Sequence, residues 1–211
     1  MDALADFRRY FAELPVIAII RGVRPEEVES IGAALVESGI RIIEVPLNSP
    51  DPLDSIGRLA RRFGDEALIG AGTVLQADDI ARVASVGGRI VVSPGFDKDV
   101  VAATIAQGLV SAPGYFTPTE AFTALSAGAH VLKLFPGEGA PPAVVKAQRA
   151  VLPKDIPLIV VGGVTSDKIA TYRAAGADGF GVGGSLYRPG QTAGEVAEQA
   201  RAFATAFRDA G

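Results

Sequence analysis

Cysteine is absent from this 211-residue sequence, and histidine occurs only once, at position 130. Without cysteine the chain has no disulfide, no thiol nucleophile and no thiolate metal site. A single imidazole cannot build the two- or three-histidine centres of zinc hydrolases and metal-dependent aldolases or epimerases. A carboxylate-only magnesium site stays open, but no clustered Asp/Glu motif supports one. We therefore expect no metal and no cofactor.

Runs of basic residues and long apolar stretches are also missing. The 20 Lys and Arg residues are scattered along a chain of net charge −4, which argues against a nucleic-acid partner. The first residues, "MDALADFRRYFAEL", carry acids early and predict a short amphipathic helix rather than a signal peptide. No segment approaches the length of a membrane span. We expect a cytoplasmic protein with no membrane partner.

The chain does contain a repeated pattern in which a helical stretch ends at glycine and a short β-branched run follows. It occurs in "VESGIRIIEVPL", "SVGGRIVVSPG", "AQGLVSAPG", "SAGAHVLKLFP" and "AAGADGFGVGG". Glycine just after a helix supplies the left-handed turn into the next strand. The runs "VIAII" (16–20), "ALIGAGT" (67–73) and "PLIVVGG" (157–163) complete eight candidate strands.

Helix-length segments separate the strands. They lie near 25–38, 51–63, 76–86, 97–107, 118–127, 140–151, 166–175 and 192–208. In "TPTE", Thr117 and Glu120 predict a capping box. Eight strand–helix units with strands apolar on both faces predict a single (β/α)8 barrel over residues 1–211, with a short N-terminal helix. A doubly wound open sheet is the alternative, but equal units without a composition break favour closure.

Two charged residues interrupt otherwise apolar strands. Glu44 lies five residues after Gly39, and Lys133 lies five residues after Gly128. Strand side chains alternate between the two faces of a sheet. Residues at the same distance from the glycine that precedes their strand are therefore predicted to lie on the same face. We expect both inside the barrel, where burial would lower the pKa of the lysine and free its amine to attack a carbonyl. Lysine and carboxylate without metal ligands suggest Schiff-base chemistry on a keto substrate.

Glycine pairs follow the last two strands, in "VVGGVTS" (160–166) and "GVGGSLYRPG" (181–190). Backbone N–H groups at such positions can approach a phosphate, and barrels often bind phosphate there. Arg21, at the end of the first strand, is a candidate partner for an anion, although a rim salt bridge explains it nearly as well. Arg188 could approach the phosphate but reads more simply as a surface-turn residue, and Glu138 has no evident role.

The segments "EVPLNSP", "GAGTVL", "SPGFD", "LKLFP", "VVGGV" and "GGSLY" occur in order across nearly the whole chain. Together they resemble the 2-keto-3-deoxy-6-phosphogluconate and -galactonate aldolases, class I enzymes on a trimeric (β/α)8 barrel. The resemblance implies a phosphorylated keto-deoxy sugar acid as substrate, pyruvate and glyceraldehyde 3-phosphate as products, and a homotrimer. It assigns the Schiff base to Lys133 and proton transfer to Glu44. It also implies a substrate site of Arg21, Thr73, Pro94 and Phe135, and a phosphate site of Gly162, Gly163, Gly183, Gly184 and Ser185.

The two branches of that family act on C4 epimers. The gluconate branch typically carries arginine after the second strand and threonine before the glycine pair of the seventh. This chain has Asn48 and Val161 near those places, as in the galactonate branch. We therefore add Asn48 and Val161 to the substrate site and expect 2-dehydro-3-deoxy-6-phosphogalactonate as substrate; the gluconate epimer or both epimers is the alternative.

Two other classes of function stay open. A metal-free sugar-phosphate isomerase or lyase would use the same glycines but leave Lys133 without a covalent role. A phosphate-ligand binding barrel would bind without turnover and would not need a lysine inside. His130 begins the sixth strand and is interpreted as a packing or edge residue rather than a catalyst.

Overall fold

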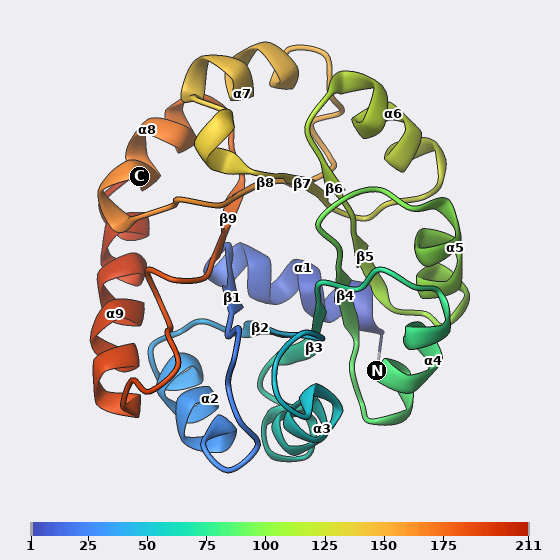
Figure 1. Cartoon of the computed structure of the whole chain (residues 1–211). Coiled ribbons are helices and arrows are strands. Elements are labelled where there is room, and N and C mark those ends of the chain that lie inside the picture. Colours follow the sequence, from blue (N-terminus) through green and yellow to red (C-terminus); the bar gives the residue numbers. More distant parts are fainter. Residues whose placement is uncertain (1, 211) are drawn as a thin grey trace.

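The computed structural model describes residues 2–210, in which parallel strands alternate with helices around a barrel (Figure 1). The strands are β1 (Val16–Ile19), β2 (Ile42–Pro46), β3 (Leu68–Gly72), β4 (Ile90–Val92), β5 (Val110–Ala112), β6 (Gly114–Tyr115), β7 (Leu132–Leu134), β8 (Leu158–Val161) and β9 (Gly179–Val182). The α-helices are α1 (Ala3–Glu13), α2 (Val28–Glu37), α3 (Pro52–Phe63), α4 (Asp78–Ser85), α5 (Lys98–Ala106), α6 (Pro118–Ser126), α7 (Pro142–Arg149), α8 (Ile169–Ala174) and α9 (Ala193–Asp209). Two 3₁₀ turns, η1 (Gly137–Gly139) and η2 (Ser166–Lys168), precede α7 and α8.

The expected fifth strand is divided into β5 and β6 at Pro113, so the described chain has nine strands rather than eight. Proline has no backbone N–H to donate to a neighbouring strand. Its carbonyl still accepts a hydrogen bond of 3.1 Å from the backbone N–H of Lys133, and the carbonyl of Ser111 accepts one of 3.1 Å from Val131. The strand order begins with β5 and ends with β6, which are halves of one extended segment. The ring therefore closes, which confirms the barrel and excludes the open sheet.

The predicted glycine turns are present. Gly39 and Gly128, which precede β2 and β7, both have a φ of 93°, a left-handed conformation that glycine adopts without a Cβ clash. The capping box is also confirmed: the Thr117 side chain accepts from the Glu120 backbone N–H, and the Glu120 carboxylate accepts from that of Thr117. The helix expected over 166–175 is instead the short turn η2 followed by α8. The same kind of glycine turn therefore precedes both β2 and β7.

Helix α1 lies across one end of the barrel (Figure 1). Its Phe7 and Tyr10 are buried in the same apolar cluster as Ile17, Leu68 and Val110, whose side chains fill the barrel interior. The Tyr10 hydroxyl donates to the carbonyl of Asp65, just before β3, so α1 covers the N-terminal ends of the strands. Chemistry at the opposite, C-terminal end is typical of this architecture.

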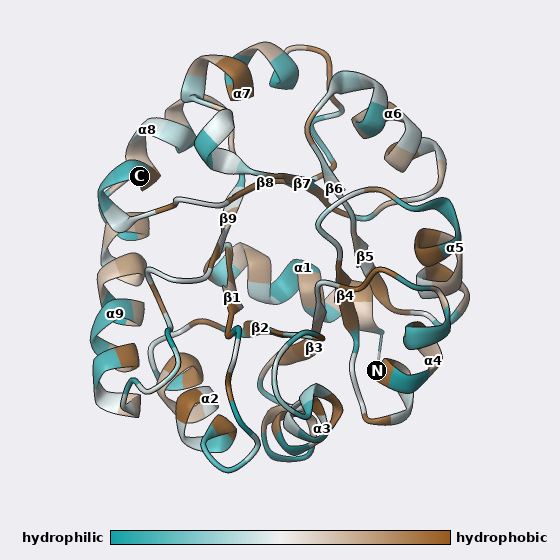
Figure 2. Ribbon diagram, viewed as in Figure 1, coloured by the Kyte–Doolittle hydropathy of each residue, from teal (hydrophilic) through white to brown (hydrophobic). Residues whose placement is uncertain are grey.

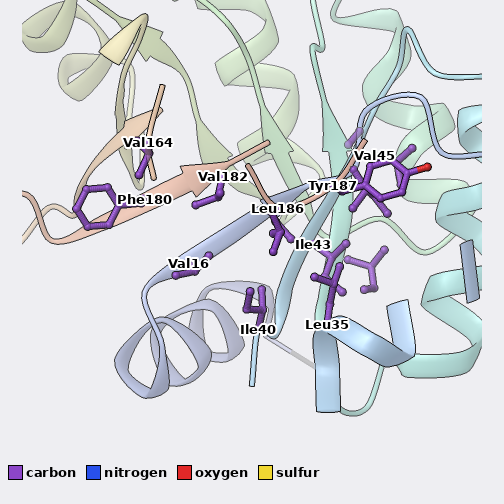
Figure 3. Close-up of a cluster of buried hydrophobic side chains, with 14 of the residues drawn as sticks. Val16, Leu35, Ile40, Ile43, Val45, Val164, Phe180, Val182, Leu186 and Tyr187 are labelled. Carbon is purple, nitrogen blue, oxygen red and sulfur yellow. The ribbon is translucent and has the colours of Figure 1, made fainter. Parts of the chain in front are cut away.

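A second apolar layer fills the space between the strands and the outer helices. Figure 3 shows part of it, with Ile43 of β2 near Leu35 of α2. Phe180 of β9 packs edge-on against Tyr172 of α8 and Phe207 of α9, with ring centroids 6.3 and 5.5 Å apart. In Figure 2 the strands are mostly hydrophobic and the helices carry hydrophilic segments. Within residues 2–210, no helix has both the length and the apolar character needed to cross a membrane.

Candidate active site

The C-terminal end of the barrel carries a cavity of about 540 Å³, within the range of small-molecule sites. Most of the residues selected from the sequence line it: Arg21, Glu44, Thr73, Pro94, Lys133, Phe135, Val161, Gly162, Gly163, Gly183, Gly184 and Ser185. Asn48 is not among the lining residues; it lies at the rim, in contact with Arg21. The barrel therefore brings together side chains that are up to 164 residues apart, from Arg21 to Ser185.

Lys133 and Glu44 both line the cavity from the barrel interior, as their equal offsets predict. Lys133 is 5% exposed and Glu44 1%. Burial lowers the pKa of the Lys133 amine to about 8, with the charge of Glu44 opposing the shift. Burial also raises the pKa of the Glu44 carboxyl to about 7, against the positive charges of Lys133 and Arg21. The pair thus provides a partly neutral amine and a carboxyl able to exchange protons near neutrality.

Glu44 occupies a pocket created by a missing side chain. A Cβ on Gly72 would lie within 3.0 Å of all three atoms of the Glu44 carboxyl group, closer than real Cβ atoms come to other atoms. The Oε2 atom of Glu44 is buried and makes no hydrogen bond to any group of residues 2–210. A buried carboxylate oxygen without a partner is costly, and such groups are common where a site needs an active proton acceptor.

Arg21 lines the cavity and is held by two side chains. Its Nη1 donates to Asn48 Oδ1 at 2.5 Å, and its Nη2 donates to Thr73 Oγ1 at 3.2 Å. Thr73 has a φ of 55°, an unusual conformation for a β-branched residue that costs about 1–3 kcal/mol. Asn48 and Thr73 therefore orient the guanidinium, which can bind a carboxylate with its remaining N–H groups.

The glycine pairs after β8 and β9 form another part of the cavity wall. Gly162 and Gly163 have φ values of 106° and 62°, so both adopt the left-handed conformation that favours glycine. Gly184 has open space around it, because a Cβ there would meet no atom of residues 2–210 within 4 Å. Ser185 donates its hydroxyl to the carbonyl of Val164 at 2.6 Å, which ties the two glycine loops together. Glycine backbone without side chains on adjacent loops suits an anion bound by backbone N–H groups.

Two cationic side chains hold backbone carbonyls of these loops. Lys168 Nζ donates to the carbonyl of Gly163 at 2.7 Å, and Arg188 Nε donates to the carbonyl of Gly184 at 2.8 Å. Arg188 also lines the cavity, so the surface-turn interpretation of this residue was incomplete. Each cation fixes a glycine carbonyl and places positive charge near the wall. Both features favour an anion at this end.

Several lining residues were missed by the sequence reading, notably Ile19, Gly181 and Tyr187. Side chains two residues apart on a strand face the same side. Counting back two residues from Arg21 to Ile19, and from Gly183 to Gly181, could therefore have identified the first two lining residues. Tyr187 is held by a 3.0 Å hydrogen bond from its hydroxyl to Glu27 Oε1, which no spacing reveals. Glu138, which the sequence left without a role, also lines the cavity.

His130 lies away from this site, at the barrel end that α1 covers. Its Nδ1 accepts a hydrogen bond of 3.1 Å from the backbone N–H of Ser111. This supports its interpretation as an edge residue.

Residues 2–210 contain no group of three or more His, Cys, Asp or Glu side chains arranged to hold a metal ion.

The chain matches known proteins over most of its length. Residues 8–200 match the family model described as "KDPG and KHG aldolase". The "Probable 2-dehydro-3-deoxy-6-phosphogalactonate aldolase" of Rhizobium meliloti (strain 1021) is 47% identical, with 92% of each chain covered. The 2-dehydro-3-deoxy-6-phosphogalactonate aldolase of Escherichia coli (strain K12) is 43% identical, covering 94% of this chain and 97% of the relative.

Structural similarity agrees with the sequence similarity. A solved structure described as "Native KDPGal structure" superposes with a TM-score of 0.92 at 43% identity, covering 94% of this chain and 96% of the other. Family model, relatives and solved structure therefore point to the same group of proteins. The chain belongs to the KDPG and KHG aldolase family.

Proposed function

We propose that this protein is a class I aldolase that cleaves 2-dehydro-3-deoxy-6-phosphogalactonate to pyruvate and D-glyceraldehyde 3-phosphate. The observation that carries the proposal is the buried Lys133 amine, its pKa lowered by desolvation to about 8, in a cavity that also contains Glu44. An amine with such a pKa is partly neutral near pH 7 and can attack a ketone. The names of the relatives support the choice of substrate.

The reaction begins when the neutral amine of Lys133 adds to the C2 carbonyl. Arg21, fixed by Asn48 and Thr73, binds the C1 carboxylate and aligns the ketone with the amine. The carbinolamine then loses water, taking a proton on its departing hydroxyl, and a protonated imine forms. The positively charged imine is an electron sink next to C3.

Cleavage follows from that sink. A base removes the proton of the C4 hydroxyl, the C3–C4 bond breaks, and its electron pair moves into the imine to give an enamine and an aldehyde. Glu44, with its pKa raised to about 7, is the group in the cavity suited to exchange this proton directly or through water. Glu44 then returns a proton to C3, and hydrolysis of the imine releases pyruvate and regenerates the lysine.

Trapping the imine tests the proposal. Pyruvate with borohydride is expected to add one reduced adduct, located on the peptide containing Lys133 and absent from Lys133→Met. A metal-free isomerase or a binding barrel would give no adduct, and a binding barrel would keep its affinity for the phosphosugar in Lys133→Met. Lys146→Met, in the exposed part of α7, is the matched control and should trap normally.

The phosphate end has its own test. Gly184→Ala adds a methyl group where nothing lies within 4 Å, so the fold should tolerate it while the approach of a phosphate is narrowed. We expect KM for the phosphorylated substrate to rise about tenfold or more, with an unchanged melting temperature. Gly194→Ala on α9, away from the cavity, is the control.

The choice between C4 epimers depends on the Val161 wall. Val161 is apolar and cannot hydrogen-bond the C4 hydroxyl, so Val161→Thr should raise the rate on the gluconate epimer relative to the galactonate epimer. Coupled pyruvate release from the two epimers measures the ratio. Equal rates in the unmodified protein would retain the aldolase and reject the branch assignment.

We also propose that each chain forms one domain over residues 1–211 and that three chains assemble into a homotrimer. The protein acts in the cytoplasm, in galactonate breakdown. Support for self-association comes from large exposed apolar side chains near α6: Phe116, Phe122 and Ile105, of which Ile105 reaches toward Gly128. Light scattering should give three times the chain mass of 21.7 kDa. Phe122→Glu is expected to dissociate the assembly, and a monomer at micromolar concentration contradicts it.

A further inference from the structure

Glu138 lines the cavity and has no role in the mechanism described above. It lies in η1, which Phe135 and Pro136 separate from β7, and it is an exposed residue that lines the cavity. Among residues 2–210, the hydrogen bonds and ion pairs of side chains include none to the Glu138 carboxylate, although Lys168 and Arg188 lie on neighbouring loops. A carboxylate acceptor that no described protein group satisfies is available for a ligand.

The position of this carboxylate is set by two glycines. A Cβ on Gly163 would lie 2.5 Å from the Glu138 Cγ, and a Cβ on Gly162 would overlap its Oε2. The backbones also touch, because a Cβ on Gly137 would lie 2.7 Å from the carbonyl oxygen of Gly162. The carboxylate therefore rests directly against the turn that forms part of the expected phosphate site.

This location is chemically unusual. A carboxylate and a phosphate both accept hydrogen bonds and repel each other, so Glu138 cannot bind the phosphate itself. A hydroxyl group near the phosphate removes the conflict, because it donates to the carboxylate. Such a contact would be charge-assisted and therefore strong.

The order of groups along the cavity identifies the hydroxyl. In the binding mode of the proposed function, Lys133 bonds to C2, Val161 faces C4, and Gly162 and Gly163 receive the phosphate on C6; all four residues line the cavity. Between C4 and the phosphate ester the proposed substrate carries one donor, the hydroxyl of C5. We propose that Glu138 accepts a hydrogen bond from this hydroxyl and selects substrates that carry it. The proposal rests on the proposed function and adds a specificity-determining residue to that site.

In the reverse direction the same hydroxyl belongs to C2 of glyceraldehyde 3-phosphate. The test compares aldol addition of pyruvate to glyceraldehyde 3-phosphate and to 3-oxopropyl phosphate, which lacks only this hydroxyl. The unmodified protein should prefer the hydroxylated aldehyde by about tenfold or more in kcat/KM. Glu138→Ala should lose that preference through a slower reaction of the hydroxylated aldehyde, and Glu138→Gln, which keeps a neutral acceptor, should retain part of it.

Two results would overturn the proposal. Equal losses for both aldehydes in Glu138→Ala would show a structural effect, and equal gains would show that the carboxylate merely repels phosphate. Glu37→Gln, an exposed glutamate on α2 outside the cavity, is the matched control and should behave as the unmodified protein.

Exchange of the pyruvate methyl protons with deuterated solvent separates this proposal from the proposed function. Exchange requires imine and enamine formation but no aldehyde, so Glu138→Ala should exchange at the unmodified rate. Absent exchange in the unmodified protein overturns the proposed function and this proposal together. Normal exchange with an unchanged aldehyde preference in Glu138→Ala overturns the proposal for Glu138 alone.

Discussion

The carboxyl group of Glu44 fills the space that a side chain on Gly72 would need. All three of its atoms lie within 3.0 Å of the position of a Cβ on that glycine. Gly72 ends β3, beside the strand that carries Glu44. The Glu44 carboxyl, which we propose transfers the proton, can therefore point into the cavity only because the neighbouring strand ends in glycine.

Gly72→Ala should consequently damage both stability and activity. The carboxyl would have to move or the strands would separate, a cost of about 1–3 kcal/mol for overpacking a filled interior. We expect a lower denaturation midpoint and a kcat reduced at least as far as in Glu44→Gln. The double variant Gly72→Ala with Glu44→Ala should regain stability without regaining activity, and a double variant no more stable than Gly72→Ala would contradict this account.

The pH dependence of imine formation follows from the coupling of Lys133 and Glu44. The Lys133 amine must be neutral to attack, and its pKa is lowered to about 8, so trapping with pyruvate should accelerate as pH rises toward and past that value. The negative charge of Glu44 raises the pKa of Lys133 and so partly offsets the effect of burial. Glu44→Gln removes the charge, so the lysine should become neutral at lower pH, and the trapping profile should move to lower pH while turnover falls.

The measurement is the initial rate of borohydride trapping across pH 5.5–9, with chemical denaturation confirming the fold at each pH. Glu37→Gln removes one carboxylate outside the cavity and serves as the control. A trapping profile that moves to higher pH in Glu44→Gln would contradict the assigned direction of the coupling.

The barrel and its central pair were predictable because they depend on local rules. Gly39 and Gly128 precede their strands with the same left-handed turn. The residues five positions later, Glu44 and Lys133, therefore both line the cavity. The contacts at the rim of the cavity could not be predicted from such local rules. The contact of Asn48 with Arg21 joins loops after β1 and β2, and the left-handed φ of Thr73 has no sequence signal in a β-branched residue. Asn48 contacts Arg21 and is not among the residues that line the cavity, so its expected contact with substrate stays a prediction.

The hydroxyl of Thr73 should act through Arg21. Thr73→Val keeps the side-chain shape but removes the acceptor of the 3.2 Å hydrogen bond, so the guanidinium loses one restraint. We expect KM to rise by about tenfold with a smaller change in kcat, because ground-state and transition-state binding of the carboxylate weaken together. Thr73→Ser keeps the hydroxyl and should restore KM.

A double-mutant cycle with Arg21→Ala distinguishes this indirect role from direct contact with substrate. Once Arg21 is removed, Thr73→Val should have almost no further effect on KM. Additive effects of the two substitutions would show instead that Thr73 binds the substrate independently of Arg21.

His130 gives the clearest prediction about stability, because it is the one histidine of the sequence. Burial and the nearby Arg8 lower its pKa below the ordinary 6.5, while Asp2 opposes the shift. Its Nδ1 accepts from the Ser111 N–H, and a protonated imidazole cannot accept there. The unfolded chain therefore binds the proton more readily than the folded one, and the stabilisation present above pH 6.5 is lost as pH falls through the lower pKa of the folded state.

Glu44 acts in the opposite sense, since its raised pKa makes the folded state bind a proton as pH falls from about 7. The two contributions are separated by comparing urea denaturation of the unmodified protein with that of His130→Asn between pH 8 and pH 5. Both proteins keep Glu44, so the unmodified protein should lose more stability on acidification than the variant. Activity at pH 8 should be equal in the two, because His130 lies at the end of the barrel that α1 covers. Parallel stability curves would show that the Ser111 contact does not depend on the protonation of His130.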